Sequence, residues 1–137
     1  MVRPTIYLSQ ADVEKIHRLI GEVVRAGNRS MSNIQQLEGE LERALVVEPH
    51  KVPPDRITMR SQALLKDQET GETMTYTLVF PEDADIDQGK ISVLAPIGTA
   101  MLGCRVGDLI DWETPGGTRS IRVEKLLYQP EAAGDYS

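Results

Sequence analysis

The chain of 137 residues carries 21 acidic and 15 basic side chains, a formal net charge of −6. Hydrophobic residues make up 40% of it, enough for the core of one domain and too many for a disordered chain. A chain this acidic gains little from the release of counterions that drives binding to nucleic acid, so we expect no direct sequence-specific binding to nucleic acid. Any action on nucleic acid is expected to pass through another protein that already holds the nucleic acid. The first residues lack a signal-peptide pattern and no apolar stretch is long enough to span a bilayer, which predicts a cytoplasmic protein with no membrane partner.

Two stretches with helical spacing of apolar residues open the chain. The first predicts a helix from the N-cap Ser9 to Ala26, after which a glycine can adopt the left-handed conformation that ends a helix. The second, over residues 34–45, predicts a helix that ends before Pro49, because the residue preceding proline disfavours helix. Two helices of similar length with a short connection predict an antiparallel helical hairpin, a short coiled coil.

The tip of this hairpin falls at residues 25–33, which include two arginines and no acidic residue. Arg25, Asn28 and Arg29 are the candidate tip residues. The sequence leaves open whether they contact a partner protein, nucleic acid or only solvent. The hairpin also has an apolar face that has to bury against something. We expect a monomer, and a dimer formed through this face is the open alternative.

Prolines at positions 49, 53 and 54 break the helical pattern, so we place a boundary there between a hairpin segment, residues 1–48, and a second domain, residues 49–137. Beyond the boundary the spacing is that of strands, with one short helix around residues 97–102. The strands are expected near residues 57–59, 63–66, 74–80, 91–94, 108–112 and 120–128. From Gln129 onward the residues are small and polar and are predicted to be loosely held. The predicted fold class is therefore α+β.

No combination of residues predicts a catalytic or metal site. The single cysteine, Cys104, lies in an apolar stretch far from any histidine in the sequence, and is predicted to be a buried structural thiol. His17 is predicted to lie at the surface and His50 in the linker. The acidic residues between positions 82 and 87 lack the spacing of an EF-hand loop and are predicted to be solvated. The glycines form no phosphate-binding loop, so we predict no enzyme activity, no cofactor and no metal.

Three motifs in the second domain follow one another in a specific order. Residues 91–103 read ISVLAPIGTAMLG, residues 106–108 read VGD, and residues 114–117 read TPGG. This ordered set resembles the signature of the C-terminal domain of the GreA and GreB transcript-cleavage factors. The ending LYQPEAAGDY, residues 127–136, is similar to that of the regulator of nucleoside diphosphate kinase (Rnk) family, a Gre-related group with a shorter helical arm. The resemblance to that family runs over the whole chain.

The resemblance implies an FKBP-like globular domain, in which an antiparallel sheet wraps on a short helix. It also implies docking beside the secondary channel of RNA polymerase, on the rim helices of the largest subunit. The contact residues implied in this chain are Ser92, Leu94, Ala95, Pro96 and Ile97. Ala95 stands where the Gre pattern has serine, so one side-chain hydrogen bond is expected to be missing. The alternative, that these residues only pack the domain, stays open.

In Gre factors, acidic residues at the hairpin tip help to hold a catalytic magnesium ion, which needs carboxylate ligands. The tip of this chain has no acidic residue, and its arm is short. The leading hypothesis is therefore a non-catalytic regulator that binds RNA polymerase and competes with Gre factors without stimulating transcript cleavage. Two alternatives remain: an FKBP-like peptidyl-prolyl isomerase or chaperone, and control of the nucleoside diphosphate kinase level by another route.

Overall fold

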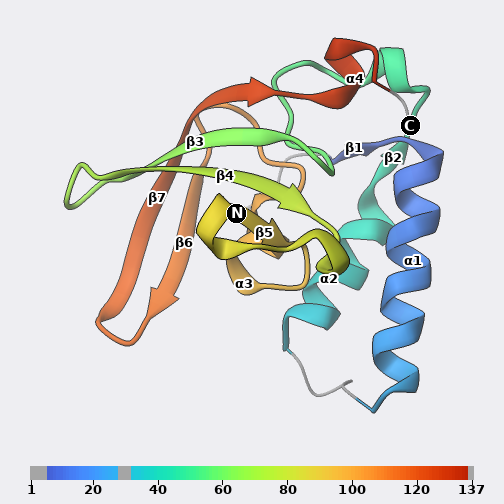
Figure 1. Ribbon diagram of the computed structural model, residues 1–137, viewed down its shortest axis with the longest axis horizontal. Coiled ribbons are helices and arrows are strands. Elements are labelled where there is room, and N and C mark those ends of the chain that lie inside the picture. The colour runs from blue at the N-terminus through green and yellow to red at the C-terminus, as the bar shows by residue number, and fades with distance from the viewer. Residues whose placement is uncertain (1–5, 28–31, 136–137) are drawn as a thin grey trace.

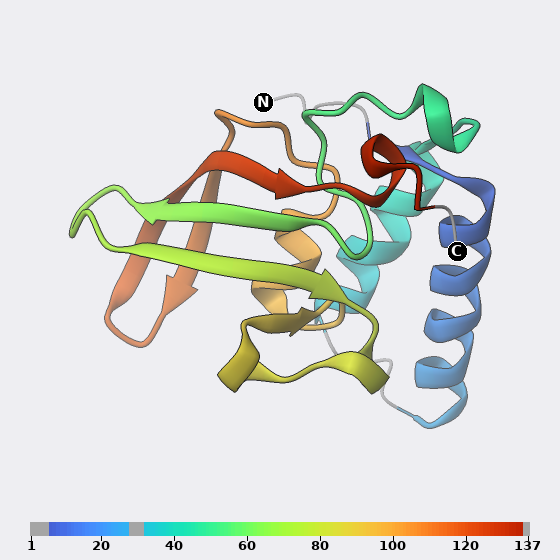
Figure 2. The same ribbon diagram turned by 45° about the horizontal axis from the view of Figure 1, so that its top comes forward.

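The computed structural model of the protein describes residues 6–27 and 32–135. In chain order, its elements are β1 (Tyr7–Leu8), α1 (Gln10–Arg25), α2 (Ser32–Arg43), β2 (Leu45–Val46), the 3-10 helix η1 (Pro49–Lys51), β3 (Gln62–Asp67), β4 (Thr73–Val79), the 3-10 helices η2 (Pro81–Asp83) and η3 (Ile86–Gln88), β5 (Lys90–Ser92), α3 (Pro96–Met101), β6 (Leu109–Thr114), β7 (Gly117–Tyr128) and α4 (Pro130–Ala133). Figures 1 and 2 show a mixed α/β arrangement, with a curled sheet on one side, α1 on the other, and α2 between them. Among the helices that the structure describes, none is long and apolar enough to cross a bilayer.

The first predicted helix is confirmed as α1, and its ends follow from local chemistry. Ser9 caps the start, where its Oγ accepts a hydrogen bond from the backbone N–H of Asp12 over 3.2 Å. This bond satisfies one of the N–H groups that the first turn of a helix leaves without a partner. The helix ends at Arg25 with Ala26 as its C-cap, and Gly27 follows with a φ of 85°, a left-handed conformation that glycine adopts at little cost.

The second predicted helix is confirmed as α2 but ends earlier than predicted, at Arg43. Leu45 and Val46 form the strand β2 instead, which pairs in parallel with β1. The backbone N–H of Leu45 donates to the carbonyl oxygen of Ile6 over 2.8 Å. As a result Leu45 is 50% exposed and does not extend the buried face of the helix. A pairing with residues almost 40 positions earlier in the chain overrides the local apolar spacing.

The main sheet has five strands in the order β5-β4-β3-β7-β6. The β3–β4, β3–β7 and β6–β7 pairs are antiparallel, whereas β5 lies parallel to β4. The prediction of a wholly antiparallel sheet was therefore wrong at this edge. Parallel neighbours need a connection that carries the chain back along the first strand. The segment with η2 and η3, which lies between β4 and β5, provides that connection.

One cluster of buried side chains joins the helices to the sheet. From α1, α2 and the inner face of the sheet in turn, this cluster includes Ile16, Ile20, Ile34, Leu37, Leu41, Ala63, Leu65, Leu78, Ile121 and Val123. In β3 the residues at positions 63, 65 and 67 are buried and their neighbours are not, the alternation expected of a strand with one covered face. The apolar faces of the two helices therefore bury in one core that they share with the sheet of the same chain.

Residues 57–59, predicted as a strand, form none. Ile57 and Met59 are buried, but the chain turns over residues 58–61, where the N–H of Ser61 donates to the carbonyl oxygen of Thr58 over 3.1 Å. The hydroxyls of Thr58 and Ser61 also lie 2.9 Å apart, within hydrogen-bond distance. Arg60 has a φ of 67°, a left-handed conformation that is uncommon for a residue with a side chain. The alternation of Ile57 and Met59 thus reflects burial in a turn.

The C-terminal segment was predicted to be loosely held, and the described part of it, up to residue 135, is firmly bonded. The Nε2 of Gln129 donates to the carbonyl oxygens of Pro53 and Arg56 over 2.8 and 2.7 Å. Glu131 is buried, and its carboxylate accepts a hydrogen bond from the Oγ1 of Thr58 over 2.6 Å. These partners lie 73 to 76 positions earlier in the chain, so the composition of the segment does not reveal them.

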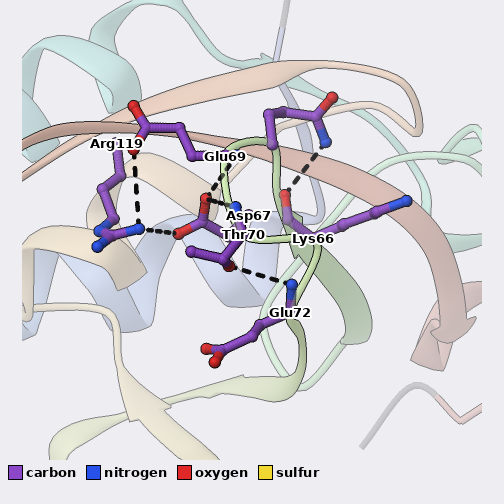
Figure 3. A network of polar contacts seen from close by, with 7 residues as sticks. Lys66, Asp67, Glu69, Thr70, Glu72 and Arg119 are labelled. Atoms are coloured by element: carbon purple, nitrogen blue, oxygen red, sulfur yellow. Dashed lines mark hydrogen bonds and ion pairs between the residues drawn. The ribbon is translucent and has the colours of Figure 1, made fainter.

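A carboxylate at the end of β3 connects two hairpins, as Figure 3 shows. The Oδ1 of Asp67 accepts hydrogen bonds from the N–H groups of Glu69 and Thr70, over 2.8 and 3.2 Å, and shapes the β3–β4 turn. Its Oδ2 accepts a hydrogen bond over 2.8 Å from Arg119, which belongs to β7. Burial raises the pKa of Asp67, but the two N–H groups and the guanidinium outweigh it, so that the pKa lies below its usual value of 3.8.

Asp67→Asn is expected to lower the stability at pH 7, because the amide keeps an acceptor for the turn but loses the charge that pairs with Arg119. The lowered pKa contributes stability above the usual aspartate pKa, and this contribution is lost as the pH falls through the pKa of the folded state. Thermal melts should show a Tm several degrees lower at pH 7 and a smaller difference at pH 3. Glu69→Gln is the control, because it removes the same charge from an exposed side chain. The Oε2 of Glu69 lies 3.9 Å from the Nη1 of Arg119, farther than the Oδ2 of Asp67 at 2.8 Å. An equal difference at both pH values would contradict this account.

Candidate functional site

The segment of residues 92–97 joins the edge strand β5 to α3 in a tight turn. The carbonyl oxygen of Ser92 accepts a hydrogen bond from the N–H of Ala95 over 3.0 Å. The Oγ of Ser92 accepts a second one from the N–H of Leu94, also over 3.0 Å. The N–H of Val93 donates to the carbonyl oxygen of Val79 over 2.9 Å, which fixes the turn to β4. The five contact residues that the sequence implied therefore lie together in one hydrogen-bonded segment.

These five residues differ in how much they expose. Pro96 is exposed, whereas Ser92, Leu94 and Ala95 are half-buried. Ile97 is only 6% exposed and belongs to the hydrophobic core. A partner protein thus has access to Pro96 and to the neighbouring turn, while Ile97 supports the segment from beneath.

Ala95 and Pro96 form the start of α3. Ala95 is the N-cap residue, and no side-chain hydrogen bond caps this helix. A serine at the N-cap accepts a hydrogen bond from the first turn of a helix, and alanine lacks the oxygen to do so. Ala95 therefore leaves this capping hydrogen bond unmade. Pro96 follows at the first helical position, where its fixed φ suits the helix and its missing N–H costs nothing.

Gly98 and Thr99 hold the segment in place, a role that the sequence did not indicate. A Cβ atom at Gly98 would lie 2.0 Å from the carbonyl oxygen of Ser92, so only glycine lets α3 pack this closely on β5. Thr99 is fully buried, and its Oγ1 donates to the carbonyl oxygen of Val93 over 2.6 Å. The one sequence signal for Thr99 is its hydroxyl within the otherwise apolar run of residues 97–102.

Of the three candidate tip residues, the structure describes only Arg25. It is the last residue of α1, and it is exposed. Asn28 and Arg29 lie outside the described residues. The nearest acidic residues along the two helices, Glu22 and Glu38, are exposed and lie several residues from the tip.

The described residues include no group of three or more His, Cys, Asp or Glu side chains that fits a metal ion. Cys104 is buried, and its Sγ donates to a carbonyl oxygen one turn earlier over 3.1 Å, as suits the structural thiol that the sequence predicted. His17 is exposed on α1, as predicted, and His50 is exposed in η1. The acidic residues between positions 82 and 87 are exposed as well, which confirms the solvated loop.

Two family profiles divide the chain. The family described as transcription elongation factor, GreA/GreB, C-term, matches residues 52–128, and the Rnk N-terminus family matches residues 4–47. The first match contains the whole five-stranded sheet and the segment 92–97. The second contains α1, α2 and the pair of short strands β1 and β2.

Relatives and solved structures agree with this division. The regulator of nucleoside diphosphate kinase from Escherichia coli (strain K12) is 42% identical over 137 residues, which cover 99% of this chain and 98% of that protein. The transcription elongation factor GreA from Chelativorans sp. (strain BNC1) is 37% identical over 95 residues, which cover 69% of this chain and 60% of that protein. The structure of a prokaryotic transcription elongation factor GreA/GreB from Nitrosomonas europaea matches with a TM-score of 0.78 at 37% identity, over 92% of this chain and 100% of that one. As its motifs predicted, the chain belongs to the Rnk family, the regulators of nucleoside diphosphate kinase, and has a GreA/GreB-like fold.

Proposed function

We propose that the protein is a non-catalytic transcription regulator that binds RNA polymerase through residues 92–97. The proposed contact lies beside the secondary channel, on the rim helices of the largest subunit. The observation that supports this most is the rigid turn with Pro96 exposed, within the region that matches the GreA/GreB family. The relatives described above are named as transcription elongation factors and as a regulator, which supports regulation in place of enzyme activity.

The proposed regulator consists of a short antiparallel hairpin arm, α1 and α2, within residues 1–48, and an FKBP-like domain over residues 49–137. Two family profiles that meet between residues 47 and 52 support this boundary. The apolar faces of both helices bury in the core of the same chain, which supports a monomer because they need no second copy to cover them. A protein that acts on RNA polymerase in this way works in the cytoplasm.

The proposed regulator competes with Gre factors and does not stimulate cleavage. Magnesium takes oxygen ligands, usually carboxylates, and the tip residues 25–33 include two arginines and no acidic residue. A protein that docks with such a tip occupies the site and supplies no ligand for the ion. The name of the Escherichia coli relative describes regulation of nucleoside diphosphate kinase, and for this chain we propose that such an effect is indirect, through transcription.

Pro96→Glu is expected to weaken binding to core RNA polymerase roughly tenfold or more, because it places an unpaired charge within the proposed contact. The fold should stay intact, because the N-terminal turn of a helix tolerates and even favours a negative charge. Binding is measured by biolayer interferometry with the full chain, and the fold by circular dichroism and thermal melting.

Pro54→Glu is the matched control. Pro54 is also exposed and lies outside the segment, and its replacement by glutamate changes the net charge by the same amount as Pro96→Glu. Ile97 is unsuitable for this test because a charge at a buried position damages the core. Equal affinities of Pro96→Glu and the unchanged protein would rule out docking through this segment.

In stalled elongation complexes, the protein alone is expected to leave the transcript uncut and, in excess, to suppress the cleavage that GreB stimulates. The physical reason is occupancy of the same site by a tip without carboxylates. Transcript lengths on a denaturing gel report the outcome, and Pro96→Glu serves as the control that loses the suppression. Cleavage by this protein alone, or full GreB cleavage in its presence, would overturn the proposal.

A further inference from the structure

The C-terminal residues 129–135, here called the latch, hold the stretch 53–61 that connects the helices to the sheet. At the start of the latch, the side chain of Gln129 donates to two backbone carbonyl oxygens of that stretch, over 2.8 and 2.7 Å. In the middle, the buried carboxylate of Glu131 accepts a hydrogen bond from the hydroxyl of Thr58 over 2.6 Å. Figures 1 and 2 both show α4, the helical part of the latch, beside the chain that leads into β3.

A third attachment joins the end of the latch to the turn at residues 58–61. The carboxylate of Asp135 accepts a hydrogen bond from Nη1 of Arg60 over 3.2 Å, and the carbonyl oxygen of Asp135 accepts one from Nη2 over 3.3 Å. The same carboxylate accepts a hydrogen bond from the hydroxyl of Tyr128 over 3.1 Å. The start, the middle and the end of the latch therefore all bind the same short connecting stretch.

The latch contributes no side chain to the hydrophobic core. In the described part of the chain, the core cluster and the side chains packed against it end at Leu126. Within the latch, all of which the structure describes, Pro130 is buried, whereas Ala132 and Ala133 are exposed. Apolar burial is the main source of stability, and a hydrogen bond contributes little net because an open segment bonds to water instead. Detaching the latch should therefore cost much less free energy than opening the sheet.

Hydrogen bonds within the latch tie its two ends to each other. The N–H of Ala133 donates to the carbonyl oxygen of Gln129 over 3.0 Å, and the N–H of Asp135 donates to that of Pro130 over 2.8 Å. Gly134 lies between them with a φ of 77°, the left-handed conformation that closes α4. Because these bonds are local, they connect the attachment at Gln129 directly with the attachment at Asp135.

The turn that the latch holds needs support from its surroundings. Arg60 has a φ of 67°, and a side-chain-bearing residue in such a conformation persists only where the surrounding structure fixes it. The latch supplies part of that support, because Glu131 binds Thr58 and Asp135 binds Arg60. Loss of the latch therefore removes two of the contacts that keep this turn in place.

We propose that the latch and the turn at residues 58–61 form one cooperative unit that opens while the hydrophobic core stays closed. In the closed state, the unit fixes the stretch 53–61 between the helices and the sheet. In the open state, that stretch loses its attachments to the latch together and gains conformational freedom. The GreA/GreB match ends at residue 128, so the latch lies beyond the region that the chain shares with that family.

The test is hydrogen exchange of the full chain at pH 7, followed by NMR at single backbone amides. Ala133 and Asp135 report on the latch, and Ser61, whose N–H donates to the carbonyl oxygen of Thr58, reports on the turn. Val123, which donates to a carbonyl oxygen over 2.9 Å within the sheet region, reports on the core. The three amides of the unit are expected to share one free energy of opening, with protection factors roughly tenfold or more below that of Val123.

Gln129→Ala removes the two hydrogen bonds at the start of the latch, and its effect is read at the far end. In a cooperative unit, the protection of Asp135 and of Ser61 falls by the same factor, about tenfold, while that of Val123 stays unchanged. Gln68→Ala is the matched control, because Gln68 is exposed and its side chain donates to a backbone carbonyl oxygen over 3.4 Å in the β3–β4 turn. The control is expected to change the protection of none of these amides.

Asp135→Asn weakens the attachment from the opposite end. Its pairing with Arg60 is partly exposed, so the expected loss of protection at Ala133 and Ser61 is smaller, about threefold. This substitution does not touch the core, so it decides the question if Gln129→Ala fails to fold.

Three outcomes would contradict the proposal. Equal protection of Val123 and the latch amides would mean that the latch opens only when the whole chain unfolds. A loss of protection in the variants that is confined to the latch, with Ser61 unchanged, would mean that the latch frays without the turn. An equal loss at Val123 would mean that the substitutions destabilise the whole fold and that no separate unit exists.

Discussion

The single hydrophobic core that α1, α2, α3 and the inner face of the sheet share is the feature on which the rest of the structure depends. Ile16, Leu37 and Leu65 come from three different elements, and each is fully buried in the same cluster. Burying one such side chain contributes about 1.5–3 kcal/mol, so a handful of them is comparable with the whole net stability of a domain. The two helices therefore cannot leave the sheet without exposing the core, and their position relative to the segment 92–97 is set by packing.

The C-terminal segment reinforces the same junction by hydrogen bonds. The stretch that precedes β3 has only a single bridge in place of a ladder, and Gln129 and Glu131 supply partners for its carbonyl and hydroxyl groups. The same segment brings Glu131 within electrostatic range of Asp12, which lies at the other end of the chain. The approach of Glu131 to Asp12 thus results from the closure of the fold, because the two residues lie at opposite ends of the chain.

The segment 92–97 combines rigidity with exposure in a different way. Its backbone is held from below by Thr99 and by the close approach of α3 at Gly98, while Pro96 stays accessible. A rigid contact loses little conformational entropy when a partner binds. At the proposed polymerase contact, affinity would then rest on shape and would not require basic side chains.

The sequence by itself determined what local chemistry controls: the capped start of α1, the face of each helix, most strands, the buried thiol of Cys104 and the order of motifs that shows the family. It also located the candidate contact residues, although not which of them is buried. Tertiary structure decided the early end of α2, the parallel edge strand β5, the turn at residues 58–61 and the bonded C-terminal segment. Each of these depends on partners far away in the chain, and apolar spacing reports only the face that a segment buries, never the residues against which it packs.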